Sequence, residues 1–288
     1  MAQIALGTVQ FGQDYGISNK RGKITEEEIK LILQEAFAKG IDTLDTAQKY
    51  GDSEARIGRA LQHSPFTFKI ISKLDPGCLI NVEDCFQQTL KRLNTEKLYG
   101  FLIHDFNVLK ANNHIWQSLL KLKEQGRVDK IGVSLYYPEE LRYLFNNHFK
   151  IDLVQVPYSI FDRRFEDYFV SLIDKDIEIH VRSVFLQGLV FLDPRKLEKR
   201  FQKIRSKLAE LRNLSERHEV PVAAICLNFA LLNEYIDRVI IGIESVQNLQ
   251  DNINARQCIQ TVKTIYPQLL SFREDDENII IPGNWQKQ

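Results

Sequence analysis

The chain has 288 residues, of which 38 are lysine or arginine and 38 are aspartate or glutamate, so its formal net charge is zero. This balance excludes a general attraction to nucleic acid or to an anionic membrane surface. No run reaches the roughly 18 apolar residues of a membrane-spanning helix, so we expect neither nucleic acid nor a membrane as a partner.

Short β-rich runs alternate with longer amphipathic segments along the chain. Eight of these runs predict strands, over residues 2–6, 41–44, 68–72, 98–103, 130–133, 153–156, 177–181 and 239–241. Most successive strand ends are roughly 30 residues apart, which is the length of one βα unit. Eight such units predict an α/β protein with the (β/α)₈ barrel (TIM barrel) architecture.

Helices are predicted between the strands. Apolar residues at helical spacing over 29–37 form one helical face, and Thr25 is placed to cap that helix at its N-terminus. A second apolar set lies over residues 116–122, and Gly126 is placed to end this helix as a C-cap.

The last interval between strands is twice the usual length. It contains a charged helix over about residues 196–218, and Pro221 is placed in the first turn of another helix. No linker rich in Pro, Gly or Ser divides the chain, so we expect an extra helical insertion before the last strand. We predict one barrel domain over residues 1–272 and a polar tail over residues 273–288, which either wraps the barrel or is loosely ordered.

The N-terminal sequence and the cysteines indicate the compartment. No basic segment followed by a long apolar run begins the chain, so we expect no signal peptide. Cys78, Cys85, Cys226 and Cys258 form no CxxC pair and have no accompanying histidine cluster, so we expect no metal site. We therefore expect reduced thiols and a cytoplasmic protein.

Polar residues at the C-terminal ends of the predicted strands are the first candidates for a site, because α/β barrels carry their chemistry there. Asp45 ends the second strand, Lys73 the third and His104 the fourth. Tyr50 follows in the loop after Asp45. A closed barrel would bring all four side chains to one mouth.

These four residue types suit proton transfer to a carbonyl. A free tyrosine has a pKa of about 10, and a nearby ammonium group such as Lys73 lowers it. Asp45 is placed to hold Lys73, and His104 to bond the substrate oxygen or share the proton. Tyr50 would then be the general acid for reduction and the base for the reverse reaction. The other interpretations are a structural Asp45–Lys73 ion pair, a satisfied buried histidine and a surface tyrosine.

The sequence around these residues resembles the aldo-keto reductase family. Eight blocks occur in that family's order: ALGTVQFG, GIDTLDTAQKYGDSEARIGRAL, ISKL, LIHD, LKEQGRVDKIGVS, DLVQVPYS, RSVFLQGL and IIGIESVQNLQDN. The resemblance covers about residues 2–258 and places the family's catalytic tetrad on Asp45, Tyr50, Lys73 and His104. It implies a (β/α)₈ barrel and an oxidoreductase that transfers hydride from NAD(P)H to an aldehyde or ketone.

The resemblance also implies a cofactor site without a G-x-G-x-x-G turn. Ser134 and Gln155 would hold the nicotinamide carboxamide, whereas Leu135 replaces a frequent Asn, so one carboxamide contact is lost. Arg182 replaces a frequent aromatic residue and can stack on the nicotinamide or bind an anionic substrate. The predicted cofactor-binding residues are Gly7, Thr8, Asp45, Ser134, Gln155, Arg182, Gly188, Gly242, Glu244, Ser245, Asn248, Asp251 and Asn252.

The segment after the last strand bears on the choice between NADP and NAD. Gly242 permits close backbone approach, and Ser245 begins a helix whose N-terminus favours an anion, although it can be a simple N-cap. Glu244 and Asn248 stand where NADP-preferring members often have cations. An acid repels a 2′-phosphate and can accept a hydrogen bond from a 2′-hydroxyl, so these residues favour NAD unless Glu244 is only a solvated loop acid.

Two other functions are compatible with the sequence. One is an NAD(P)-binding regulatory or accessory subunit with little turnover, and the other is a dehydratase or sugar-modifying relative. The short loop HDFNVLKANNH after the fourth strand indicates an open mouth and a larger small-molecule substrate, such as a sugar. The sequence does not indicate an oligomeric state.

Overall fold

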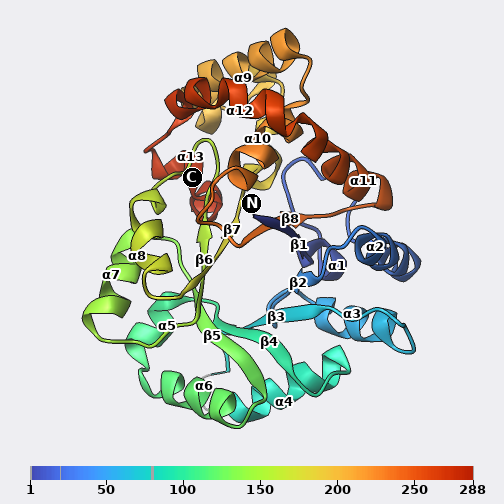
Figure 1. Ribbon diagram of the computed structural model, residues 1–288, viewed down its shortest axis with the longest axis vertical. Coiled ribbons are helices and arrows are strands. Elements are labelled where there is room, and N and C mark those ends of the chain that lie inside the picture. The colour runs from blue at the N-terminus through green and yellow to red at the C-terminus, as the bar shows by residue number, and fades with distance from the viewer. Residues whose placement is uncertain (1, 20, 79–80, 288) are drawn as a thin grey trace.

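The computed structural model of the protein describes residues 2–19, 21–78 and 81–287. Eight parallel strands close into a barrel in chain order, with β8 paired to β1 (Figure 1). The strands are β1 (Gln3–Gly7), β2 (Thr43–Asp45), β3 (Lys69–Leu74), β4 (Leu98–Ile103), β5 (Val128–Ser134), β6 (Leu153–Pro157), β7 (Glu178–Arg182) and β8 (Arg238–Gly242). The predicted barrel and its eight strands are confirmed, with most ends shifted by one or two residues.

Strand register places the polar strand ends on one rim. Gly7 is paired in register with Asp45 on one side and with Gly242 on the other. Ser134 is paired with Gln155 between β5 and β6. Because all strands run parallel, their C-terminal ends share this rim, and the side chains that follow them meet at the same mouth.

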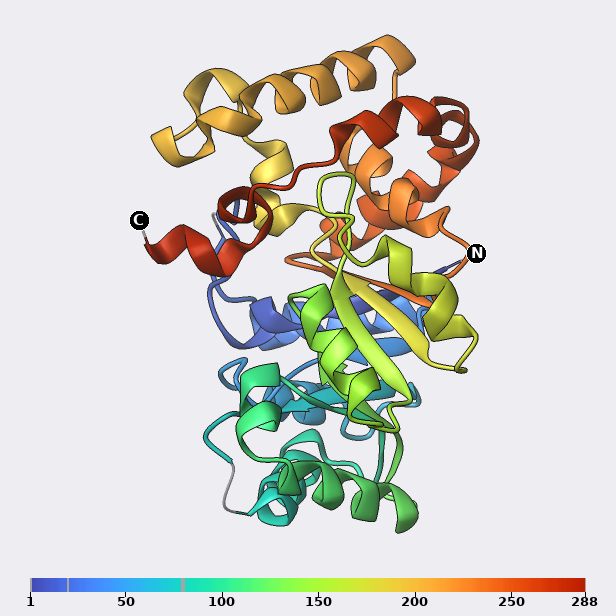
Figure 2. The same ribbon diagram turned by 90° about the vertical axis from the view of Figure 1, so that its left-hand side faces the viewer.

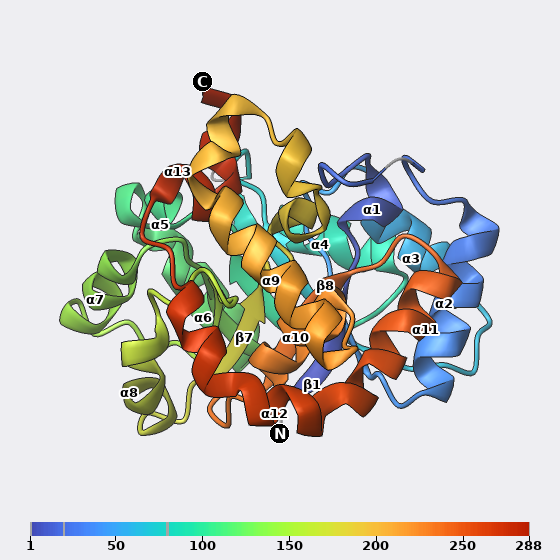
Figure 3. The ribbon, with the colours of Figure 1, turned by 90° about the horizontal axis from the view of Figure 1, so that it is seen from above.

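Helices surround the barrel (Figures 1 and 3). Those before the insertion are α1 (Val9–Gly12), α2 (Glu26–Ala38), α3 (Ser53–Leu61), α4 (Val82–Leu93), α5 (Phe106–Ala111), α6 (His114–Glu124), α7 (Pro138–Asn146) and α8 (Phe169–Ile173). Thr25 caps α2 as predicted, since its hydroxyl accepts a hydrogen bond from Glu28 N at 3.2 Å. Gly126 follows α6 with a φ of 71°, a conformation that suits glycine after a helix.

The insertion before β8 is confirmed, but its helix is shorter than predicted. Two 3₁₀ segments, η3 (Pro194–Lys196) and η4 (Lys199–Ile204), precede α9 (Arg205–His218), and α10 (Val222–Leu231) follows. Leu197, Phe201 and Ile204 are buried. Their spacing of four and three residues imitates an α-helical face, which explains why the helix was expected from residue 196.

The C-terminal part packs against the insertion. After α11 (Val246–Ala255), α12 (Ile259–Leu269) and η6 (Leu270–Phe272), the tail forms α13 (Glu277–Ile280) and η7 (Pro282–Lys287). The Trp285 ring is buried against Phe201 with 4.9 Å between ring centroids. Figures 2 and 3 show the tail beside the insertion. It therefore wraps the molecule rather than being loosely ordered, and the domain boundary at residue 272 stays a prediction.

The expectation of four reduced thiols is wrong. Cys78 and Cys85 form a disulfide, with 6.1 Å between their Cα atoms, whereas Cys226 and Cys258 are free. Cys78 follows β3 and Cys85 lies in the first turn of α4, and these two positions are within disulfide range. The cytoplasmic location stays a prediction without this support. Within the described residues, no helix is long and apolar enough to cross a membrane, and no group of three His, Cys, Asp or Glu side chains could hold a metal ion.

Candidate active site

Asp45 and Lys73 form a buried ion pair at the ends of β2 and β3. Lys73 Nζ lies 2.8 Å from Asp45 Oδ1 and 2.7 Å from Oδ2, and it also donates to Thr46 O at 2.9 Å. The side chain of Lys73 is only 1% exposed and that of Asp45 only 5%. Burial lowers the pKa of Lys73, and the charge of Asp45 opposes this effect. The bonds leave the ammonium group little freedom to reorient.

Tyr50 and His104 lie beside this pair. Their rings meet edge to face, with 5.6 Å between centroids, and Lys73 Nζ is 5.1 Å from the centroid of the Tyr50 ring. The structure therefore brings the four predicted residues into one cluster. Their catalytic roles stay predictions.

The pKa of Tyr50 moves in the direction opposite to our expectation. Burial raises it above the ordinary value, and the negative charge of Asp45 raises it further, while Arg182 lowers it. The expected net lowering of this pKa is wrong, because burial and the Asp45 carboxylate disfavour the phenolate more strongly than the neighbouring positive charge favours it. Tyr50 therefore keeps its proton at neutral pH, as a general acid requires.

His104 is a neutral imidazole at physiological pH. Burial lowers its pKa to about 3, and the positive charge of Lys73 adds to this effect. Its Nδ1 atom is buried and has no hydrogen-bond partner among the described residues. An unpaired buried polar atom costs free energy, and at a cavity wall a role in binding or catalysis is one explanation for it.

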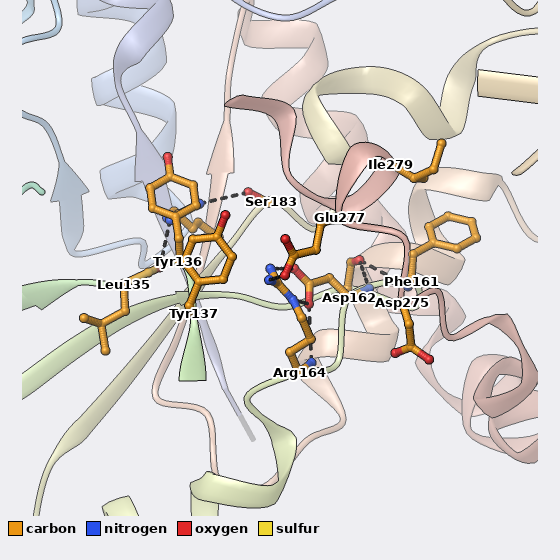
Figure 4. A network of polar contacts seen from close by, with 12 residues as sticks. Leu135, Tyr136, Tyr137, Phe161, Asp162, Arg164, Ser183, Asp275, Glu277 and Ile279 are labelled. Atoms are coloured by element: carbon orange, nitrogen blue, oxygen red, sulfur yellow. Dashed lines mark hydrogen bonds and ion pairs between the residues drawn. The ribbon is translucent and has the colours of Figure 1, made fainter. Parts of the chain in front are cut away.

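Arg182 ends β7 and is held against the loop after β5. One terminal nitrogen, Nη2, donates to Leu135 O at 3.0 Å, and the guanidinium carbon lies 4.2 Å from the centroid of the Tyr136 ring. The other, Nη1, contacts Ser183 Oγ at 3.4 Å. Ser183 has a φ of 66°, which non-glycine residues rarely adopt, and such strain concentrates at functional sites. Figure 4 shows Tyr136 and Ser183 in this region.

The tail reaches the same loop through Arg164. This arginine donates two hydrogen bonds to Asp162, at 2.9 and 2.8 Å, and lies 3.8 Å from Glu277 of α13 (Figure 4). Its guanidinium carbon is 5.6 Å from the centroid of the Tyr137 ring. The tail is thereby fastened beside the loop that carries Tyr136.

Two adjoining cavities meet at the cluster. The inner cavity has a volume of about 480 Å³ and extends to the end of β8. The outer cavity has a volume of about 730 Å³, and its wall includes Lys49 and Gly283. Tyr50, His104 and Arg182 line both cavities, so they lie at the junction between them.

The inner cavity is lined by all but one of the predicted cofactor residues, namely Gly7, Thr8, Asp45, Ser134, Gln155, Arg182, Gly188, Gly242, Glu244, Asn248, Asp251 and Asn252. The exception is Ser245, whose hydroxyl accepts a hydrogen bond from Asn248 N at 3.0 Å and caps α11. A Cβ atom at Gly242 would lie 2.8 Å from Gln10 Nε2, the end of a flexible side chain, so the expected close approach of the cofactor to this glycine stays a prediction. Binding roles for these residues stay predictions.

Tyr15, Tyr136 and Gln187 are among the lining residues that were missed from the sequence. Gln187 Nε2 donates to Tyr15 Oη at 2.6 Å, and Gln187 O accepts a hydrogen bond from Ile17 N at 2.9 Å. The loops after β1 and β7 are therefore joined to each other, although β8 separates these strands in the barrel. The position of these residues after predicted strand ends could have indicated them from the sequence. The contact between the two distant loops could not have been predicted in this way.

Known proteins resemble this chain over most of its length. A model described as the Aldo/keto reductase family matches residues 3–269. Probable aldo-keto reductase 1 of Glycine max is 26% identical over 263 residues, which cover 81% of this chain and 75% of that protein. NADH-specific methylglyoxal reductase of Escherichia coli (strain K12) is 25% identical over 218 residues, covering 66% and 65% of the two chains.

A solved structure supports the fold. The holo form of aldo-keto reductase AKR11C1 from Bacillus halodurans has a TM-score of 0.72 to this chain at 19% sequence identity. The match covers 96% of this chain and 94% of that chain. At this level of identity the likeness supports the barrel architecture and nothing finer.

Proposed function

Because the chain belongs to the aldo/keto reductase family, we propose that it is an NAD(P)H-dependent oxidoreductase that reduces an aldehyde or ketone to an alcohol, with Tyr50 as the general acid. Family membership supports a carbonyl-reducing oxidoreductase in general. The observation that carries the finer proposal is the junction of the two cavities, where Tyr50 and His104 are backed by the buried Asp45–Lys73 pair.

The substrate carbonyl oxygen would lie at this junction. Bound NAD(P)H supplies a hydride to the carbonyl carbon. Tyr50 Oη donates a hydrogen bond to the carbonyl oxygen and then transfers its proton, so that an alcohol forms. The neutral His104 ring orients the carbonyl by hydrogen bonding. In the reverse direction, the Tyr50 phenolate takes the proton from the alcohol.

The Asp45–Lys73 pair would act through Tyr50. When Tyr50 gives up its proton, negative charge forms on a ring whose centroid lies 5.1 Å from the Lys73 ammonium. A cation at this range stabilises the phenolate. Asp45 keeps Lys73 protonated and in position, and its own charge holds the proton on Tyr50 in the resting protein.

The residues that line the inner cavity support the proposal that it binds a nicotinamide dinucleotide. Gln155 Nε2 donates to Asp45 Oδ1 at 2.7 Å, which leaves Gln155 Oε1 to accept a hydrogen bond from a carboxamide. At the far end, Glu244 and Asn248 line the wall. Apart from Arg182, no lysine or arginine of the described residues lines this cavity. A wall without cations there favours the 2′-hydroxyl of NADH over the 2′-phosphate of NADPH.

The substrate side is the outer cavity. Its volume of about 730 Å³ and its polar wall support a substrate larger than a simple aldehyde, such as a sugar. The direct experiment follows oxidation of NADH and of NADPH with a panel of aldehydes and open-chain sugars. Turnover of at least one carbonyl substrate is expected. Nucleotide binding without turnover of any of them would instead indicate an accessory subunit.

A further inference from the structure

Arg182 is a cation without a carboxylate partner at the junction of the two cavities. Within residues 2–19, 21–78 and 81–287, no carboxylate oxygen lies within 4.0 Å of its guanidinium nitrogens. The neighbouring cation, Lys73, differs in this respect, because Asp45 neutralises it. The side chain of Arg182 is partly exposed, and it lines both cavities together with Tyr50 and His104.

The protein holds this guanidinium in place without using all its donors. A guanidinium has five N–H donors. Arg182 uses one on Leu135 O and another on Ser183 Oγ, and its face packs on the Tyr136 ring. The nearby Arg164 is a useful contrast, because both oxygens of Asp162 bind it and its side chain is only 11% exposed (Figure 4). Arg182 is held by uncharged acceptors alone, and its remaining donors have no carboxylate partner among the described residues.

The electrostatics of the junction favour an incoming anion. The charge of Arg182 lowers the pKa of Tyr50 against the stronger effect of burial, so the guanidinium is within electrostatic reach of the reacting oxygen. The other charged residues on the outer wall, Asp14 and Lys49, have opposite signs and are both exposed. Arg182 is therefore the charge at the junction that is left for a ligand to neutralise.

We propose that the substrate carries an anionic group, a carboxylate or a phosphate, a few atoms from its carbonyl, and that Arg182 binds this group. This assignment of substrate class rests on the function proposed above. The planar guanidinium matches either anion with two parallel hydrogen bonds, which fixes orientation as well as position. With the anion on Arg182, the carbonyl is directed towards Tyr50 and His104, which line the same junction.

The test compares matched pairs of substrates that differ in charge. One pair is succinic semialdehyde and its neutral amide, and the other is glyceraldehyde 3-phosphate and glyceraldehyde. For each pair the ratio of kcat/KM, anionic over neutral, is measured in the wild type and in Arg182→Met, Arg182→Lys and Lys263→Met, the last of which changes an exposed lysine that lines neither cavity. Because a ratio is compared, a loss of cofactor binding that affects both members equally cancels.

We expect the wild type to prefer the anionic member of at least one pair by tenfold or more. Arg182→Met should lower that ratio by about 10- to 100-fold, the effect of losing a hydrogen-bonded charge. Arg182→Lys should recover part of it, because lysine restores the charge but not the paired donors. Lys263→Met should leave the ratio unchanged. The pair that shows the preference distinguishes a carboxylate from a phosphate. Ratios near one for both pairs, or a ratio unaffected by Arg182→Met, would overturn the proposal.

A binding measurement separates this proposal from the proposed function. Succinate and inorganic phosphate are titrated by calorimetry into the wild type and Arg182→Met, each saturated with the nucleotide that it binds more tightly. Binding that weakens at least tenfold in the variant, without reduction of any aldehyde, would support the anion site and reject the reductase. Reduction of neutral aldehydes without anion binding would support the reductase and reject the anion site.

Discussion

Gln155 Nε2 donates a hydrogen bond to Asp45 Oδ1 over 2.7 Å. The same carboxylate binds Lys73 through both its oxygens. Asp45 therefore connects the residue expected to hold the nicotinamide carboxamide with the residues expected to transfer the proton. A change at Asp45 should disturb nucleotide binding and proton transfer together.

The Asp45–Lys73 pair can be tested for a role beyond structure. Asp45→Asn leaves the Lys73 charge buried and unpaired, and we expect it to lower the free energy of unfolding by about 3–5 kcal/mol. The double variant Asp45→Asn with Lys73→Met removes both charges and should recover most of this stability, as measured by urea denaturation. Reductase turnover should stay low in both. If turnover recovered together with stability, the pair would be structural only.

The pH profile should differ between the two directions of the reaction. Reduction needs protonated Tyr50, and because burial and Asp45 raise its pKa, the rate should stay level from about pH 6 to 9. Alcohol oxidation needs the phenolate, so its rate should rise with pH throughout that range. His104 has a pKa of about 3, so its titration should not change the rate within this pH range. A loss of reductase activity centred between pH 6 and 8, measured under single-turnover conditions, would contradict this assignment.

Nucleotide preference should respond to the wall formed by Glu244 and Asn248. The double variant Glu244→Lys with Asn248→Arg is expected to tighten NADPH binding about tenfold relative to NADH, because it places donors and positive charge where a 2′-phosphate would lie. Quenching of protein fluorescence gives both dissociation constants. Gln247→Lys is the matched control, since Gln247 is exposed on the same helix and does not line the cavity. Wild-type protein that binds NADPH tens of times more tightly than NADH would contradict the preference for NADH.

The tail should affect the substrate more than the nucleotide. Trp285→Ala removes a buried ring that packs on Phe201, and we expect a loss of about 3–5 kcal/mol in stability, measured by urea denaturation. Because Pro282 and Gly283 of the tail line only the outer cavity, KM for the carbonyl substrate should rise while the Kd for nucleotide stays within about twofold. If the Kd for nucleotide rose as much as the KM for the carbonyl substrate, the tail would be acting on both cavities and not on the outer one alone.

Local sequence patterns predicted the strands and the barrel architecture well. Each β-rich run became a strand, and because parallel strands end on one rim, Asp45, Lys73 and His104 could be grouped before their geometry was known. The 3₁₀ segments before α9 were misjudged because the buried residues 197, 201 and 204 have helical spacing. The disulfide between Cys78 and Cys85 depended on where the first turn of α4 lies relative to the end of β3, which the spacing of the cysteines does not reveal.

The properties that depend on contacts between distant elements were the least predictable. The sequence suggested that Lys73 would act on Tyr50, but it could not show that Asp45 binds Lys73 through both oxygens and acts on Tyr50 itself. Likewise, Arg182 ends β7, whereas Leu135 and Tyr136, which hold it, follow β5. Burial and cross-strand contact decide both cases, and neither is encoded in a local motif.

The central claim is that Tyr50 supplies the proton, and single-turnover reduction by Tyr50→Phe tests it most directly. With nucleotide already bound, the phenylalanine variant should reduce a good aldehyde about 100- to 10,000-fold more slowly than the wild type, the usual contribution of a general acid, while its Kd for nucleotide stays the same. Tyr15→Phe, which alters another tyrosine on the walls of both cavities, should remain within about tenfold of the wild type. A Tyr50→Phe variant that binds nucleotide and reduces the aldehyde at the wild-type rate would contradict the claim.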